Sequence, residues 1–187
     1  MPLIVVRSLL HSLAELLANF RKVPYLLWKV CSTFSVHPSP ALGVTDASPI
    51  FDTVSNLYGT TYGGGTYNDG AVYELTPQPG GDWTEKVLHS FNGKNGNDCY
   101  SGLLFDVAGN LFGTTRQGGA YDQGIVFELT PNTGLGWTEK VLHIFNNNGK
   151  DGAYPGSGLI FDAAGNLYGV ASFGGAHNGG IVFEITP

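Results

Sequence analysis

The chain has 187 residues, of which 28 are glycine and 13% are charged, and its formal net charge is −6. Binding to a nucleic-acid backbone requires a basic surface, so this acidic balance argues against nucleic acid as a partner. Glycine at about twice its usual share, together with 12% aromatic residues, is typical of an all-β protein rich in turns.

The N-terminal quarter of the chain differs from the rest. Residues 1–23 form an amphipathic, targeting-like segment, and residues 24–48 form a linker or a degenerate first strand. A degenerate export signal, a strand of the first unit and a packing or membrane-surface helix are the three interpretations of this region. No stretch reaches the ~18 uncharged apolar residues that cross a membrane, so we expect no transmembrane span.

The rest of the chain repeats. The sequence NLYGTTYGGGTYNDGAVYELTP at residues 56–77 returns as NLFGTTRQGGAYDQGIVFELTP at 110–131 and as NLYGVASFGGAHNGGIVFEITP at 166–187. The copies are spaced by 54 and 56 residues, as their first residues show. A glycine-rich period of this length predicts a β-repeat architecture. We place the three units at residues 49–102, 103–158 and 159–187.

Each full unit contains four short segments rich in Val, Ile, Phe, Tyr, Trp and Thr, bounded by turn residues, and none shows a helical period. In the second unit these segments are Leu103–Asp106, Asn110–Thr115, Gly124–Pro131 and Trp137–Phe145. Four antiparallel strands per unit predict a β-propeller-like fold with three blades, as a partial ring or one completed by oligomerisation. A β-trefoil, which also has twelve strands in three units, is the alternative. Open blade edges favour self-association.

A weaker echo of the repeat precedes the first unit. The sequence WKVCSTF at residues 28–34 aligns with EKVLHSF at residues 85–91, the fourth strand of the first unit. On this alignment the chain starts with the last strand of a unit and ends with the third. The N-terminal strand can then complete the final unit.

The repeated pattern resembles a known family. Gly158 to Gly169, the pair Gly174-Gly175 and Gly180 to Pro187 match the repeat of the choice-of-anchor tandem repeat GloVer family, and WTEKVLHSF at residues 83–91 fits the same pattern. The resemblance covers about residues 49–187. It implies a bacterial exported or surface protein with a β-propeller-like fold and no established enzymatic activity. Members carry many units and varied C-terminal anchors, whereas this sequence shows three units and no anchor after Pro187, which fits a fragment, a truncated gene or a self-associating partial ring.

Several repeated polar residues have both a structural and a chemical interpretation. Asp52, Asp106 and Asp162 recur just before an Asn and could bind Ca²⁺, but one carboxylate per turn supplies too few ligands, so we expect hydrogen-bonded turns. Ser55 stands where the other two turns have glycine, so we expect the first turn to be looser. We interpret Cys99 as a free surface thiol in an inter-unit loop.

The glutamates, histidines and tryptophans of the strands recur in the same way. We expect the glutamates to be solvated strand residues that pair with lysines, the histidines to be structural, and the tryptophans to pack between blades, with sugar stacking as the alternative. The residues concerned are Glu74, Glu128, Glu184, His89, His143, Trp83 and Trp137. The sequence therefore predicts no catalytic residue, no metal site and no cofactor.

The glycine-rich loops are the predicted ligand-binding surface. Their residues vary between copies while the flanking strands stay alike, which is the behaviour of binding loops on a rigid scaffold. Tyr, Asn and Asp suit the recognition of polyols or peptides. The predicted ligand-binding residues are Tyr62, Tyr67, Asn68, Asp69, Arg116, Gln117, Tyr121, Asp122, Gln123, Phe173, His177 and Asn178.

These patterns favour a non-catalytic exported or cell-surface repeat module that mediates adhesion, assembly or the binding of a glycan or protein ligand. The alternative is a fragment of a β-propeller enzyme of the lyase, lactonase or glycosidase type. An enzyme should break the symmetry of the repeat with a polar cluster found in one unit, whereas most polar positions here recur.

Overall fold

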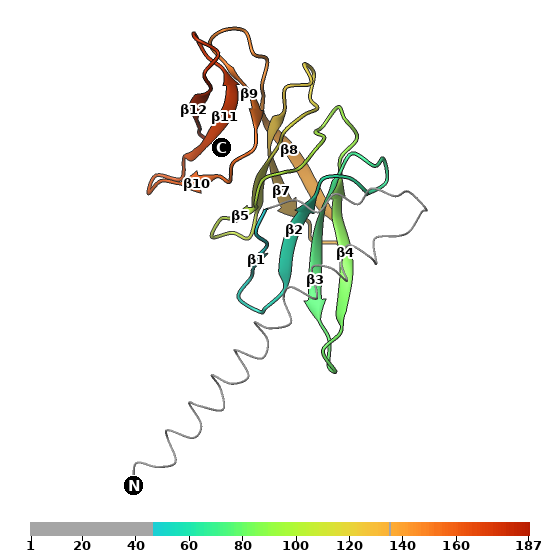
Figure 1. Cartoon of the computed structure of the whole chain (residues 1–187). Coiled ribbons are helices and arrows are strands. Elements are labelled where there is room, and N and C mark those ends of the chain that lie inside the picture. The colour runs from blue at the N-terminus through green and yellow to red at the C-terminus, as the bar shows by residue number, and fades with distance from the viewer. Residues whose placement is uncertain (1–46, 135) are drawn as a thin grey trace, which may run out of the picture. The chain divides into compact units, whose positions relative to one another are not determined.

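The computed structural model describes residues 47–134 and 136–187 (Figure 1), and every regular element among them is a β-strand. The strands form three four-stranded antiparallel sheets. The segments 1–23 and 24–46, including the echo at residues 28–34, lie outside the described residues. Within the described part of the chain, no helix has the length and apolar character needed to cross a membrane.

Sheets 1 and 2 are simple meanders in which each strand pairs with the next. Sheet 1 consists of β1 (Ile50–Phe51), β2 (Leu57–Thr61), β3 (Ala71–Pro77) and β4 (Trp83–Ser90). Sheet 2 repeats it with β5 (Leu104–Phe105), β6 (Leu111–Thr115), β7 (Ile125–Pro131) and β8 (Trp137–Ile144).

Sheet 3 reaches four strands in a different way. It consists of β9 (Gly152–Pro155), β10 (Ile160–Phe161), β11 (Leu167–Gly174) and β12 (Ile181–Ile185). The strands β9 and β10 pair with different parts of β11, and among the described residues β12 pairs with β11 alone. The position that β4 and β8 occupy in the other sheets is therefore not filled by a described strand.

The predicted all-β, blade-like architecture is confirmed. Three separate antiparallel sheets, two of them meanders of the same strand order, are what a propeller blade repeat produces, whereas a β-trefoil would join its strands in a shared barrel. The described sheets do not close a ring. The register also repeats, since Glu74 lies opposite Lys86 and Glu128 opposite Lys140.

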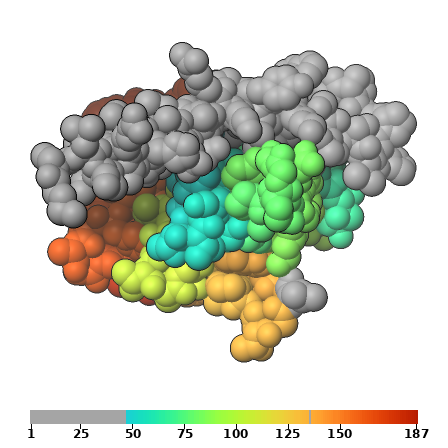
Figure 2. All heavy atoms as spheres, turned by 90° about the horizontal axis from the view of Figure 1, so that it is seen from below, coloured from blue at the N-terminus to red at the C-terminus, as the bar shows by residue number. Residues whose placement is uncertain are grey.

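The turn between the first two strands is built by the repeated aspartate. Asp106 Oδ1 accepts hydrogen bonds from the backbone N–H groups of Ala108 and Asn110, both at 2.8 Å, and its Oδ2 accepts one from the Asn110 side chain at 2.8 Å. Asp52 and Asp162 make the same three bonds. Figure 2 views the end of the molecule that carries these turns. The role of these carboxylates is thus to stabilise the turns through hydrogen bonds.

The expectation of a looser first turn is wrong. Ser55 adopts a positive φ of 71°, close to the 86° of Gly109, and the same hydrogen bonds close the turn. The three bonds to Asp52 hold a serine in the left-handed region that glycine enters more readily.

The sheets are joined by apolar side chains that cross from one sheet to the next. Tyr58 and Val72 of sheet 1 belong to one cluster with Phe127 of sheet 2, and a second cluster joins Phe112 and Val126 of sheet 2 to Phe183 of sheet 3. Because side chains alternate along a strand, one face of each sheet packs against the opposite face of the next.

A phenylalanine just after the fourth strand completes each junction. Phe91 and Phe145 are fully buried and lie 5.2 Å and 5.1 Å, centroid to centroid, from Phe127 and Phe183 of the following sheet. The invariant glycine of the second strand makes room for the receiving ring. A Cβ on Gly113 would lie 2.6 Å from Phe127 Cζ, the residue directly opposite it in the sheet.

The interpretation of Cys99 as a surface thiol is wrong. Its side chain is fully buried in the cluster between sheets 1 and 2, with Sγ 3.7 Å from the carbonyl oxygen of Thr114. Burial raises the pKa of this thiol well above its ordinary value. The residue serves as a small apolar side chain.

Replacing Phe145 by Ala tests the junction between sheets 2 and 3. The variant leaves a cavity where a buried ring stood, so we expect the free energy of unfolding in urea to fall by about 3–5 kcal/mol. The control Val107→Ala, at an exposed position of the β5–β6 turn, should change it by no more than about 0.5 kcal/mol. Equal effects of the two variants would contradict this account of the core.

Candidate functional site

The glycine-rich loops that join the second and third strands have the same internal structure in all three sheets. In each, a side-chain oxygen accepts a hydrogen bond from a glycine N–H four residues earlier, at 3.1 Å for Asn68, 2.9 Å for Asp122 and 3.0 Å for Asn178. These three residues have positive φ angles of 64°, 56° and 53°. They therefore shape the loops, and one oxygen of each is engaged in doing so.

The segments that connect one sheet to the next run between neighbouring loops. In the first connection, Arg116 N–H donates to Asp98 O at 2.8 Å and Asn97 N–H donates to Gln117 O at 2.9 Å. In the second, β9 pairs with the end of β11, and Tyr154 N–H donates to Gln123 O at 2.9 Å. The connections are thus fixed to the loops by backbone hydrogen bonds.

This arrangement creates a line of aromatic rings and one arginine across the three sheets. We call it the aromatic row, and it consists of Tyr62, Tyr100, Arg116, Tyr154 and Phe173. The rings of Tyr62 and Tyr100 are 5.1 Å apart, and those of Tyr154 and Phe173 are 5.8 Å apart. The guanidinium carbon of Arg116 lies 5.7 Å from the ring centre of Tyr100 and 5.6 Å from that of Tyr154.

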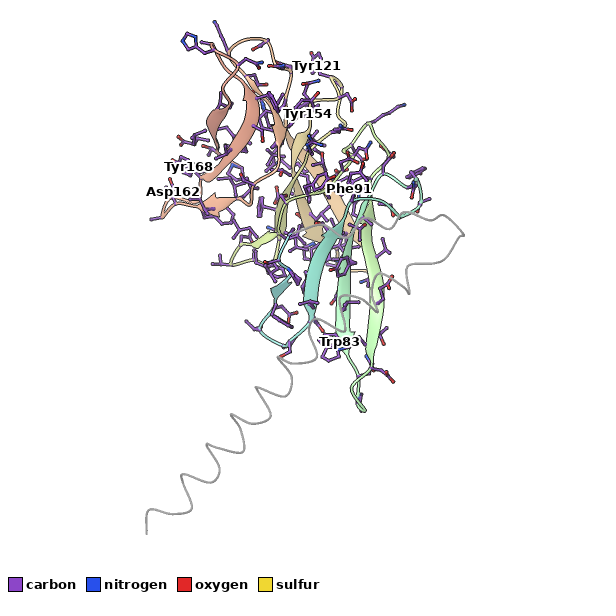
Figure 3. All side chains as sticks on the ribbon, in the orientation of Figure 1. Trp83, Phe91, Tyr121, Tyr154, Asp162 and Tyr168 are labelled. Atoms are coloured by element: carbon purple, nitrogen blue, oxygen red, sulfur yellow. The ribbon has the colours of Figure 1, made fainter. Side chains whose placement is uncertain are left out.

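Arg116 is held between two aromatic rings by cation–π contacts, so its side chain is fixed although it is exposed. Tyr154 lies at the loop end of the sheets, and Trp83 lies at the opposite end of sheet 1 (Figure 3). Trp83, which the sequence offered as part of an alternative stacking platform, therefore lies outside the aromatic row (Figure 3).

Asp98 lies near both Arg116 and two further carboxylates, Asp69 and Asp122. Asp98 is buried, and its burial raises the pKa of its carboxyl group, with Arg116 opposing the shift and Asp122 and Asp69 adding to it. The charge of Asp98 in turn raises the pKa of the Tyr62 hydroxyl. One arginine among three acidic groups gives this surface no excess of positive charge, which suits neutral hydroxyl-rich ligands better than anions.

The predicted ligand residues fall into three groups. Tyr62, Arg116 and Phe173 belong to the aromatic row. Asn68, Asp122 and Asn178 shape the loops. The others lie on or beside the loops outside the row, and they are Tyr67, Asp69, Gln117, Tyr121, Gln123 and His177.

Tyr100, Tyr154 and Asp98 were missed by the sequence reasoning, because they lie in the connections rather than in the repeated core. A signal for the two tyrosines does exist. Each connection has one tyrosine, five or seven residues before the Phe of the next Phe-Asp pair. The unequal spacing hides their common position.

A second polar cluster lies at the junction of sheets 1 and 2. The Asn95 side-chain amide donates to Glu139 Oε2 at 2.7 Å and lies 3.1 Å from His89 Nε2, which is 3.5 Å from the same carboxylate oxygen. Glu139 Oε1 is buried, and no described residue hydrogen-bonds to it. Burial raises the pKa of Glu139 to about 7 and lowers that of His89, so both groups favour their neutral forms.

The other repeated glutamates and histidines make local contacts. Glu128 lies 3.6 Å from Lys140, as expected for a strand glutamate, and Glu74 accepts a hydrogen bond from the Tyr58 hydroxyl at 3.0 Å. His143 Nε2 lies 3.1 Å from Asp151 Oδ1, which belongs to the connection to sheet 3. These contacts support the structural interpretation of the residues.

The sequence profile of the Gloeobacter/Verrucomicrobia repeat matches residues 32–187, and the chain belongs to this family. The predicted membership is thus confirmed, and the match includes all three sheets as well as the residues that lead into the first. A comparison with curated proteins found no match.

Glu139→Gln tests the electrostatics of the sheet junction. The pKa of Glu139 is about 7 in the folded chain against an ordinary value of 4.5. Between these pH values the folded chain holds a proton that the unfolded chain has released, so the free energy of unfolding falls as the pH rises, by up to about 3 kcal/mol. The Gln variant should lose this part of the pH dependence and be more stable than the wild type at pH 8.

Urea unfolding at pH 5 and at pH 8 measures the difference. Glu184→Gln, which removes an exposed carboxylate from β12, is the matched control and should keep the wild-type pH dependence. If Glu139→Gln instead keeps the wild-type pH dependence of the free energy of unfolding, the carboxylate of Glu139 is not held in its neutral form by burial.

Proposed function

We propose that this member of the Gloeobacter/Verrucomicrobia repeat family is a non-catalytic repeat module of an exported or cell-surface protein, and that it binds a glycan along its loop face. The observation that carries the proposal is the aromatic row, in which two pairs of rings are joined by the guanidinium of Arg116 across the three sheets. A row with this extent suits an extended chain molecule better than a single small ligand.

The chemistry of the row favours a neutral polysaccharide. Aromatic rings stack on the apolar faces of sugars and bury area with little loss of conformational freedom. Arg116 adds hydrogen-bond donors in a fixed geometry, and the carboxylate of Asp69 or Asp122 offers acceptors to hydroxyl groups. An exposed peptide with aromatic side chains is the second ligand that this surface suits.

The enzyme alternative rests on one observation, the raised pKa of Glu139 in a polar cluster that contains His89. The position of Glu139 argues against a catalytic role for its carboxyl group. The side chain of Glu139 is 12% exposed and lies between two sheets, hydrogen-bonded to Asn95, rather than on the loop face. A general acid must reach its substrate, so this burial supports a structural role.

Export and self-association belong to the same proposal. The segment at residues 1–48 and the family resemblance support export to the cell surface. The outer edge of β12 pairs with no described strand, and residues 28–34 carry a weaker echo of the strand that fills this edge in sheets 1 and 2. An open sheet edge invites another strand.

Affinity electrophoresis of the full chain through gels containing single polysaccharides tests the binding function. We expect a neutral polysaccharide to retard the wild type, and Tyr100→Ala to weaken the binding by about 3- to 10-fold because one stacking ring is lost. The control Tyr121→Ala removes an exposed ring that lies outside the aromatic row and should leave the binding unchanged.

Two results would contradict the proposal. One is that no neutral polysaccharide retards the wild type. The other is that Tyr121→Ala weakens binding as much as Tyr100→Ala while both variants keep the wild-type circular dichroism spectrum.

A further inference from the structure

One face of sheet 3 is exposed and carries several apolar side chains together with Glu184, which lies opposite Tyr168, whereas the same face of the other sheets is largely buried. Val182 is 76% exposed, whereas its counterparts Val72 and Val126 are fully buried. Val170 is 47% exposed, whereas Thr114, at the same position of sheet 2, is fully buried. We call this surface, formed by Ile160, Tyr168, Val170 and Val182, the open face.

In sheets 1 and 2 the following sheet covers the corresponding face. Tyr58 of sheet 1 meets Phe105 of sheet 2 edge to face, with ring centres 5.0 Å apart. Phe112 of sheet 2 meets Phe161 of sheet 3 in the same way at 5.2 Å. At each junction, an aromatic residue of the second strand therefore packs on the phenylalanine of the next sheet's first strand.

Each of the two partners in this contact recurs once more without its counterpart, one in sheet 3 and the other in sheet 1. Tyr168 occupies the position of Tyr58 and Phe112 on the open face, on the side of sheet 3 turned away from the other sheets (Figure 3). Phe51 occupies the position of Phe105 and Phe161 in sheet 1, and it is 53% exposed. Sheet 3 thus presents one side of this ring contact, and Phe51 of sheet 1 presents the other.

The two ends do not meet within the described part of the chain. Each of the two hydrophobic clusters joins sheet 2 to one neighbour, and neither contains residues of both sheet 1 and sheet 3. Leu57, Tyr73 and Leu75, which lie beyond Phe51 on the same face of sheet 1, are already buried. The contact available at sheet 1 is therefore centred on Phe51.

We propose that the open face of sheet 3 docks on the Phe51 side of sheet 1 of a second copy of this chain, with Tyr168 packed against Phe51 of the partner. The contact repeats one part of the internal junctions, the packing of a second-strand aromatic ring on the phenylalanine of a first strand. The rest of the junction is not repeated, because Leu57, Tyr73 and Leu75 are already buried. Because the two surfaces differ, the interface is heterologous, and two copies that each use both surfaces form a closed dimer. The inference concerns assembly and goes beyond the proposed binding function.

The test is light scattering on a sizing column with the full chain, followed by mixing of two variants. We expect the wild type to form a dimer. Ile160→Glu, directly opposite Tyr168 on the open face, and Phe51→Glu each place a charge on one side of the interface, so each alone should be monomeric. A mixture of the two should form a heterodimer, since the first variant keeps an intact Phe51 and the second keeps an intact open face.

The control is Val107→Glu, which places the same charge on an exposed turn and should leave the dimer intact. A wild-type chain that stays monomeric up to the limit of its solubility overturns the proposal. A dimer that survives Phe51→Glu overturns it as well, because the contact then joins two copies of sheet 3. An open polymer overturns the closed dimer. Circular dichroism of each variant identifies a loss of folding.

Discussion

The structure depends on one repeated interaction, in which the phenylalanine that follows the fourth strand of a sheet packs against the next sheet. Phe91 and Phe145 are fully buried in this position, each packed on an aromatic ring of the following sheet. A single four-stranded sheet of this repeat has two apolar faces and cannot bury both alone. Stability is therefore shared between neighbours, as in other repeat proteins.

The same constraint produces the surface that we assign to binding. After the phenylalanine has packed into the next sheet, the backbone must turn back to reach the first strand of that sheet. It makes this connection between two glycine-rich loops. The backbone hydrogen bonds of this return path place Tyr100 and Tyr154 beside Arg116. The aromatic row is thus a consequence of how the sheets are connected, and its spacing is as rigid as the stack.

Much of the fold could be predicted from the sequence, because its signals are local. The strands, the register of the repeat and the aspartate turns follow from residues within a few positions of one another. The buried state of Cys99 could not be predicted, since it depends on how two sheets pack. The aromatic row was found only in part, because Tyr100 and Tyr154 lie in connections of unequal length that sequence alignment does not superimpose.

The central claim is that each sheet is stabilised by its neighbours, and hydrogen–deuterium exchange of the full chain tests it most directly. Sheet 2 is packed on both faces, and β7 pairs on both edges. The account predicts that amides of β7 exchange most slowly, and that protection of β12 rises with protein concentration as a second copy covers sheet 3. Equal protection of β7 and β12 at every concentration would contradict the account.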